Sequence, residues 1–387
     1  MQVKLSSEQE MLQESAGRYL RDRYSFAERT RIVASADGYD KLKWRDFAEM
    51  GWLGLPFPEE HGGSGATMFE VMLLMKEFGR SLVVEPFLSS VVLGGLTVLY
   101  AGDKEQKRKF LSQIAAGQTQ VALGFAEPEA GYNAHTIRTA AKAEGEGFRL
   151  NGKKAVVFGA PSSDYMIVSA RTSGEPSDMQ GISLFIFQRS TPGVTLRSYQ
   201  TIDGRRAAEV VLDDVRLGRD QLIGEAGSGG PVIDQVLMAG RVAVVGEAVG
   251  SLNGAIDRTI EYLNTREQFG KKLASFQALR HRLADMYVLT READALAGVA
   301  AQAFISSESP GRFAAVSGAK AYVGEKGRWV AENAVQLHGA IAIADEYIVG
   351  HYLKRVVSID RLFGDVEHNL ENFMKSAGPL AQCDRFA

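Results

Sequence analysis

The chain has 387 residues, of which 45% are hydrophobic and 24% charged, a composition that predicts a globular enzyme of two or three closely packed domains. A formal net charge of −3, with no block of like charge, argues against nucleic acid and anionic lipid as partners. A single cysteine, Cys383, and the absence of a Cys/His cluster at metal-ligand spacing argue against a disulfide framework and against a metal site.

The sequence also carries no signal for a membrane or for export. Its N-terminal segment lacks the apolar core of a signal peptide, and no apolar run reaches membrane-spanning length. The single cysteine fits a reducing compartment. We therefore expect a cytoplasmic protein.

Residues 1–118 are predicted to form a helical domain. Ser7 and Glu10 have the spacing of a capping box, and apolar residues recur after them at helical intervals. Segment 56–65 holds two prolines and three glycines, so we predict a loop there. Helices are expected to resume at about Thr67.

Residues 119–225 are predicted to form a domain of β-strands. Short apolar or alternating runs are separated by turn residues, which indicates a small antiparallel sheet or barrel. The strongest hairpin signal is Asn151-Gly152, because this pair supplies the positive φ angles of a type I′ turn. It would join strands 148–150 and 153–158. Further strands are expected at 165–170, 182–188, 194–199 and 209–212.

Residues 226–387 return to helical periods and are predicted to form a bundle. Its first helix carries apolar residues spaced by threes and fours, which defines a buried face. Glycines recur in this helix at a cost in helix propensity, and they indicate close approach of another helix or a ligand, with tight packing the simpler interpretation. These glycines are Gly240, Gly246, Gly250 and Gly254. The order helices, strands, helices places the chain in the α+β class.

Several short motifs occur in the order and spacing seen in acyl-CoA dehydrogenases. Each is weak alone, but the colinear set spans nearly the whole chain. It consists of Gly51-Trp52-Leu53-Gly54-Leu55-Pro56, Glu127-Pro128-Glu129-Ala130-Gly131, Asn151-Gly152-Lys153-Lys154, Arg266-Glu267-Gln268-Phe269-Gly270, Phe276-Gln277, Leu283-Ala284-Asp285-Met286 and Gln336-Leu337-His338-Gly339. The chain thus resembles the acyl-CoA dehydrogenase family. This resemblance implies a helical N-terminal domain, a middle antiparallel β domain and a C-terminal four-helix bundle.

The resemblance also implies a reaction. Family members remove an α proton from an acyl-CoA thioester with a carboxylate, while the β hydrogen leaves as hydride to the N5 atom of FAD. This chemistry needs a desolvated base on one face of the substrate and the flavin on the other. Electron-transferring flavoprotein is the acceptor that the resemblance implies.

The residues that contact the adenosine half of FAD are retained. In the family, the Arg-x-Gln-Phe-Gly motif reaches across a subunit interface to the FAD pyrophosphate, and Arg266, Gln268 and Phe269 match it. Gln336 and Gly339 match a second motif on the adenine side, where glycine permits close backbone approach. We therefore expect these five residues to bind FAD.

One further arginine matches a substrate-contacting position. Arg241, at the start of the glycine-spaced helix, corresponds to a family arginine near the thioester arm of CoA. Its alternative role is a salt bridge between helices or subunits.

The catalytic base is missing from both positions that the family uses. The usual glutamate lies 27 residues after the glutamine of the adenine motif, and Phe363 occupies that position here. The other family position, just before the helix arginine, is Gly240. Within the chain, Glu247 and Asp365 are the candidates for a relocated base. Glu247 lies seven residues past Gly240, about 10 Å further along the helix axis, so we favour a structural role for it.

The residues that hold the flavin ring in the family are also replaced. The threonine before the Glu-Pro motif is Ala126, and the serine of Ala-Gly-Ser-Asp is Tyr132. The family Trp-Ile-Thr is Val156-Val157-Phe158, so an indole and hydroxyl donors are lost. The chain keeps residues given to a neighbour's FAD and lacks those for a flavin of its own.

This asymmetry resembles the non-base subunit of heterotetrameric acyl-CoA dehydrogenases of the sterol side-chain and pimeloyl types. Segments 345–352 and 362–365 point the same way. The main hypothesis is a subunit of an α2β2 enzyme with two FAD per tetramer, acting on a bulky or cyclic acyl-CoA. The alternatives are a self-sufficient homotetramer with Glu247 or Asp365 as base, and a flavin-free structural homologue.

Overall fold

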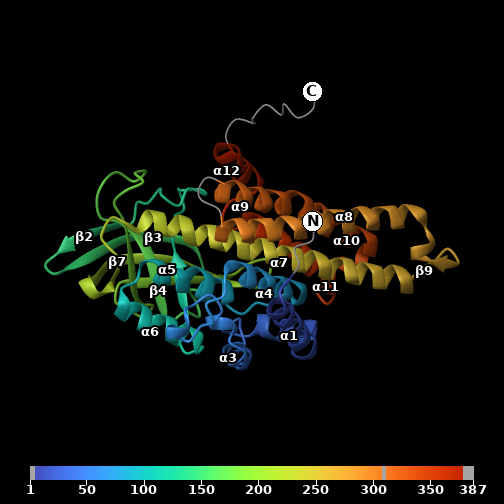
Figure 1. Cartoon of the computed structure of the whole chain (residues 1–387), viewed down its shortest axis with the longest axis horizontal. Coiled ribbons are helices and arrows are strands. Elements are labelled where there is room, and N and C mark those ends of the chain that lie inside the picture. Colours follow the sequence, from blue (N-terminus) through green and yellow to red (C-terminus); the bar gives the residue numbers. More distant parts are fainter. Residues whose placement is uncertain (1–4, 307–310, 378–387) are drawn as a thin grey trace. The chain divides into compact units, whose positions relative to one another are not determined.

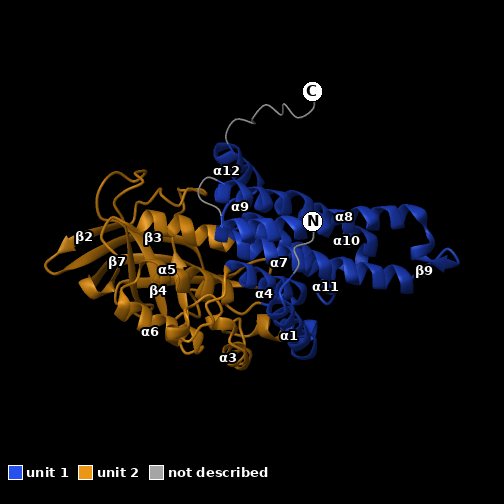
Figure 2. Cartoon of the chain, in the orientation of Figure 1, with its two compact units in different colours: residues 1–30, 68–83, 241–387 blue, residues 31–67, 84–240 orange. Residues whose placement is uncertain are grey.

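The computed structural model describes residues 5–306 and 311–377 (Figure 1). The chain forms two compact units, each assembled from separate stretches of sequence (Figure 2). Unit 1 comprises residues 1–30, 68–83 and 241–387, and unit 2 comprises residues 31–67 and 84–240. Across the described ranges, no helix combines the length and apolar character needed to cross a bilayer.

Unit 2 is built on an eight-stranded sheet with the order β6-β7-β3-β2-β4-β5-β8, in which β1 pairs with β4. The strands are β1 (Val121–Gly124), β2 (Ala140–Glu144), β3 (Gly147–Phe158), β4 (Tyr165–Arg171), β5 (Ile182–Gln188), β6 (Val194–Gln200), β7 (Arg206–Gly218) and β8 (Leu222–Ile223). The strands expected at 165–170, 182–188 and 194–199 are confirmed. Most pairings are antiparallel, as expected, but β1 pairs with β4 in parallel, so the sheet is mixed.

Helices of unit 2 include α3 (Lys41–Glu49), α5 (Leu96–Ala101), α6 (Lys104–Ala115) and a π-helical turn at Leu88–Gly95. The loop predicted at 56–65 contains one 3-10 turn, Glu59–His61, and similar turns lie at Trp52–Gly54 and Arg219–Gln221. Helix α2 (Phe26–Ala34) includes residues of both units.

The hairpin predicted at Asn151-Gly152 is wrong, because β3 continues through this pair. The turn between β2 and β3 lies instead at Gly145, which has a φ of 58°. Asn151 Oδ1 accepts a hydrogen bond of 2.9 Å from the Asp214 backbone N–H, at an irregularity between β3 and β7. A Cβ at Gly152 would lie 2.6 Å from Thr139 Cα. The pair therefore serves a bulge and a close backbone approach rather than a turn.

Unit 1 is helical, with a two-stranded hairpin at one end. Its helices are α1 (Ser7–Arg23), α4 (Met68–Ser81), most of α7 (Gly229–Thr265), α8 (Gln277–Ser306), α9 (Gly311–Tyr322), α10 (Arg328–His338), α11 (Ile348–Arg361) and α12 (Val366–Ala377). A π-helical turn at Val323–Gly327 joins α9 to α10, and 3-10 turns lie at Leu273–Ser275 and Gly339–Ile343. The hairpin pairs β9 (Glu267–Gln268) with β10 (Lys271–Lys272).

The capping box of α1 lies one residue earlier than predicted at Ser7 and Glu10. Ser6 is the N-cap, and its hydroxyl accepts from the Gln9 backbone N–H at 3.2 Å. The Gln9 side chain accepts from the Ser6 N–H at 2.9 Å. Serine and glutamine complete this reciprocal pair, so the helix begins at Ser7.

The glycines of α7 provide close packing within unit 1. A Cβ at Gly250 would lie 1.7 Å from the carbonyl oxygen of Lys76, and Gly246 meets the same helix α4 one turn earlier. In return, a Cβ at Gly79 of α4 would lie 1.9 Å from the Glu247 carbonyl oxygen. These glycines therefore mark close approach of another helix, and they fix the backbone that carries Glu247.

Candidate functional site

The Arg-x-Gln-Phe-Gly motif forms the exposed hairpin that joins the ends of α7 and α8 (Figure 1). Arg266 and Gln268 are exposed, and Phe269 is 89% exposed. Phe269 and Gly270 are the two turn residues, with φ angles of 54° and 74°. An aromatic residue at positive φ is uncommon and strained. The turn therefore presents a cation, an amide and an aromatic ring to the outside of the chain.

The second motif predicted to contact FAD, Gln336 to Gly339, lies at the C-terminal end of α10. Gly339 has a φ of 67° and a ψ of −147°, a conformation that favours glycine, and open space lies where a Cβ would stand. Beside it, His338 is buried and stacks on Tyr262 of α7, with ring centroids 4.5 Å apart. Burial lowers the pKa of His338. The stack joins the C-terminal ends of α7 and α10. Tyr262 lies about one helical turn before Arg266.

These two motifs fit the adenosine half of a dinucleotide. An exposed guanidinium such as Arg266 can pair with a pyrophosphate, and the amides of Gln268 and Gln336 can bond the adjoining oxygens. The bare backbone at Gly339 allows a ring system to approach closely. All five predicted residues are exposed on unit 1.

Both positions that would hold a base are closed. Phe363 lies in the turn between α11 and α12, is 8% exposed and has a φ of 57°. Gly240 is buried and has no side chain. Neither position offers a proton acceptor.

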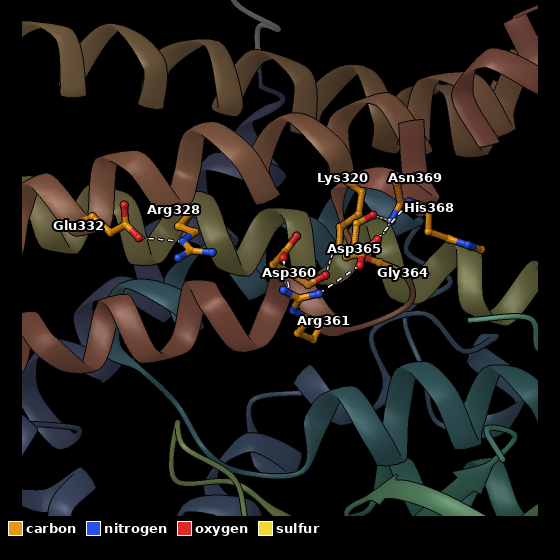
Figure 3. A network of polar contacts seen from close by, with 9 residues as sticks. All are labelled: Lys320, Arg328, Glu332, Asp360, Arg361, Gly364, Asp365, His368 and Asn369. Atoms are coloured by element: carbon orange, nitrogen blue, oxygen red, sulfur yellow. Dashed lines mark hydrogen bonds and ion pairs between the residues drawn. The ribbon is translucent and has the colours of Figure 1, made fainter. Parts of the chain in front are cut away.

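The turn at 362–365 is held by two buried cations, of which Figure 3 shows Lys320. Lys320 of α9 donates from Nζ to the carbonyl oxygens of Asp360 at 3.1 Å and Gly364 at 2.9 Å. Arg241 donates from Nε to the Phe363 carbonyl oxygen at 2.9 Å. The structure thus places Arg241, predicted near the thioester arm of CoA, on the backbone of this turn.

Asp365, one candidate for a relocated base, uses both of its carboxylate oxygens for contacts within its own segment. Its Oδ1 accepts from the His368 backbone N–H at 3.0 Å, which caps the first turn of α12. Its Oδ2 pairs with Nη1 of Arg361 at 3.1 Å (Figure 3). Both oxygens are engaged.

Glu247, the other candidate, forms a buried ion pair with Arg355 of α11. Arg355 Nε lies 2.8 Å from Oε1, and Arg355 Nη2 lies 2.6 Å from Oε2. Glu247 is fully buried, and Arg355 is nearly so. A two-pronged pair of this kind satisfies both carboxylate oxygens and compensates the buried charge. This geometry supports the structural role favoured for Glu247.

In unit 2, the threonines, the tryptophan and the serine that hold the flavin ring in the family are replaced, and two of the replacing residues are exposed. Val156 is 46% exposed and lies at a φ of 50°, where the pairing of β3 with β7 shifts register. A β-branched residue at positive φ is strained, which marks a deliberate bulge. Tyr132 is 38% exposed, and Ala126 offers the strand only its carbonyl oxygen, which accepts from the Ala155 N–H. The residues present do not reproduce a hydrogen-bonded flavin site.

A buried pair behind this surface orders the loop that begins at Glu127. Lys154 Nζ lies 2.6 Å from Glu127 Oε1 and 3.1 Å from Ser169 Oγ. Glu127 also accepts from the backbone N–H groups of Arg138 at 2.8 Å and Thr139 at 3.1 Å. Burial lowers the pKa of Lys154 to about 8, against the raising effect of Glu127. The frame of the loop is therefore intact although the ring-binding residues are changed.

Sequence reasoning assigned no role to three of the residues that organise these sites. Lys154 was noted only as part of a family motif, and Lys320 and Arg355 were not singled out. Single basic residues in a strand or helix usually reach the surface. Lys320 did carry a signal, because it is the one charged residue in the small, apolar run 313–324.

Comparison with known proteins identifies the family. The profile of the acyl-CoA dehydrogenase N-terminal domain matches residues 6–118, that of the middle domain matches 122–215, and that of the C-terminal domain matches 227–377. The chain belongs to the acyl-CoA dehydrogenase family. The predicted α+β fold of this family is confirmed, and its cofactor is FAD.

Individual relatives of this acyl-CoA dehydrogenase family member cover most of its length. The probable acyl-CoA dehydrogenase YngJ of Bacillus subtilis is 29% identical, over 92% of this chain and 93% of the relative. The caffeyl-CoA reductase-Etf complex subunit CarC of Acetobacterium woodii is 32% identical over 78% and 80%. The solved structure of the Tcur3481-Tcur3483 steroid ACAD superposes with a TM-score of 0.84 at 27% identity, covering 95% and 96%. These relatives support an acyl-CoA dehydrogenase or reductase activity.

Proposed function

We propose that this chain is the non-base subunit of an α2β2 acyl-CoA dehydrogenase. The observation that carries the proposal is the state of the base positions. Phe363 and Gly240 offer no acceptor, and the two in-chain candidates, Glu247 and Asp365, are engaged in ion pairs. The proton acceptor then comes from a homologous partner subunit.

The contribution of this chain is to hold FAD across the interface. Arg266, Gln268 and Phe269 project from the hairpin, and Gln336 and Gly339 face outward beside it. They would contact the pyrophosphate and adenosine of an FAD whose ring lies in the partner. When bound, FAD accepts the hydride from the β carbon of the substrate. Two FAD per tetramer follow, because only the partner retains ring-binding residues.

The likeness to the Tcur3481-Tcur3483 steroid ACAD, which pairs two chains, supports this assembly. We infer by the same likeness an acyl-CoA substrate with a bulky or cyclic acyl group. Electron-transferring flavoprotein is the proposed electron acceptor, and CarC, named as part of an Etf complex, supports it. A self-sufficient homotetramer is less well supported, since it would need Glu247 or Asp365 to leave its partner.

Assembly is tested by expressing the chain alone and together with a homologue that carries the family glutamate. The complex should contain two FAD per four subunits, measured by flavin absorbance against protein concentration. The chain alone should retain little FAD. Stoichiometric FAD in the homo-oligomer would contradict the proposal and favour the self-sufficient enzyme.

A further inference from the structure

The turn at 362–365 keeps a strained shape although it carries no base. Phe363 lies in the left-handed region, with a φ of 57°, and Gly364 follows with a φ of 102°. A Cβ at Gly364 would lie 2.3 Å from the His368 ring, so glycine is required there. An aromatic residue in this conformation is strained, and it persists only when the surrounding structure holds it there.

Two buried cations hold the turn in this conformation. Lys320 bonds the carbonyl oxygens of Asp360 and Gly364, which lie on either side of Phe363, and Arg241 bonds the carbonyl oxygen of Phe363 itself. Asn369 of α12 adds a bond of 2.8 Å to the Gly364 oxygen (Figure 3). We call Lys320 and Arg241 the cation pair of this turn.

The cation pair is costly, which argues that the shape of the turn is needed. Lys320 is 1% exposed, and burial lowers its pKa to about 8. Its ammonium donates hydrogen bonds to backbone carbonyls rather than to a carboxylate, so it stabilises the backbone conformation of the turn directly. Arg241 is likewise buried.

The turn directs Phe363 inward. Its side chain is 8% exposed, whereas Tyr132 and Val156, at the flavin-ring positions, are 38% and 46% exposed. A residue that lined an open acyl site would be accessible in a ligand-free chain. The residue at the family's base position is therefore an aromatic ring buried within the chain.

We propose that Phe363, positioned by the cation pair, blocks the acyl site of this chain, so that no thioester reaches its base position. The inference rests on the proposed function and adds its stoichiometry, because one acyl-CoA would bind per αβ pair. Phe363 is then a specificity-determining residue that excludes substrate, and Lys320 is a positioning residue that acts through it.

The test of the block uses S-butyl-CoA, a thioether that carries an acyl-length chain, against CoA itself. Calorimetry on the full chain alone should give no tighter binding for S-butyl-CoA than for CoA. Phe363→Gly, which tolerates the positive φ and removes the ring, should bind S-butyl-CoA at least about tenfold tighter than CoA. Phe363→Leu should show a smaller preference, and Phe373→Ala, at a partly exposed ring of α12, should match the parent.

The test of positioning compares Lys320→Met with Lys326→Met, a change at a partly exposed lysine six residues further along. Lys320→Met should speed hydrogen exchange of segment 360–366 at least about tenfold and should raise the preference for S-butyl-CoA over CoA. Lys326→Met should change neither quantity.

Two results would overturn the inference. One is a parent chain that already binds S-butyl-CoA about tenfold tighter than CoA. The other is folded Phe363→Gly and Phe363→Leu proteins with no preference. Both measurements use the chain alone, whereas the proposed function is tested by the FAD content of the complex, so failure of the inference can be distinguished from failure of the proposed function.

Discussion

At the scale of single residues, Arg266 is the cation that we propose for the pyrophosphate of a neighbouring subunit's FAD. Arg266→Ala should sharply reduce FAD retention in the assembled complex, because a desolvated contact between phosphate and guanidinium is among the stronger polar contacts. Flavin absorbance per tetramer measures this. Arg258→Ala is the matched control, since Arg258 is an exposed arginine of the preceding helix α7 that pairs with Glu261. Equal flavin content in the two variants would remove Arg266 from the site.

Glu247 tests whether a buried carboxylate in this chain is structural or catalytic. Glu247→Gln keeps the side chain's shape but leaves the Arg355 charge uncompensated, so the free energy of unfolding should fall by about 3 kcal/mol. Turnover of the folded complex should stay within about tenfold of the parent. Urea unfolding and steady-state kinetics measure the two effects.

The double variant Glu247→Gln/Arg355→Met separates charge from packing. Removing both members of the ion pair should restore part of the lost stability, because no uncompensated charge then remains in the core. A folded, FAD-loaded Glu247→Gln complex without detectable dehydrogenation would instead make Glu247 the base.

At the scale of elements, the contact between α4 and α7 depends on absent side chains. Gly250→Ala would place a methyl group 1.7 Å from the Lys76 carbonyl oxygen, so the helices must separate. We expect a loss of about 1–3 kcal/mol in the free energy of unfolding. Gly311→Ala is the control, because no atom lies within 4 Å of its Cβ position. Equal thermal midpoints for the two variants would show that α4 can move away from α7 without a loss of stability.

Much of this element packing could be predicted from the sequence, because its signals are local. The glycine spacing of α7, the continuous apolar runs of β4 and β5 and the alternation of β6 follow directly from local sequence patterns. Asn151-Gly152 misled because the same positive-φ preference serves a turn or a bulge, and the pairing strand decides between them. The capping box was predicted one residue too late for a similar reason. Ser6 and Ser7 are adjacent, and each is followed three residues later by a residue that can complete the box.

The candidate site was predictable only where motifs carry it. Arg266 and Gly339 belong to strings that resemble the family, so their positions could be found before the structure. Lys320 and Arg355 act on partners 40 and 108 residues away in sequence, Asp360 and Glu247, and no local pattern encodes such pairs. The closure of the base position by Phe363 is likewise a tertiary property.

At the scale of the whole molecule, acid should weaken unit 1. Burial is the largest cause of the lowered pKa values of His338, His351 and His368. The unfolded chain then binds more protons than the folded chain as pH falls below about 6.5, so the contribution of these neutral histidines to stability is fully present above that value and declines below it. The denaturant concentration at the unfolding midpoint should therefore decrease as the pH is lowered from 7.5 to 5.5.

His338→Phe keeps an aromatic ring against Tyr262 and removes one of these titrating groups. Its midpoint should depend less on pH than that of the parent. His281→Phe, at an exposed histidine of α8, is the control. A midpoint that rises on acidification, or an unchanged slope in His338→Phe, would contradict this account.

The central claim is that the proton acceptor lies outside this chain. The most direct measurement is turnover of a CoA thioester by the co-expressed complex after the homologue's family glutamate is changed to glutamine. We expect turnover to fall by several orders of magnitude while FAD content stays at two per tetramer, and no carboxylate substitution in this chain should do the same. Undiminished dehydrogenation by that complex, or robust dehydrogenation by this chain alone, would contradict the claim.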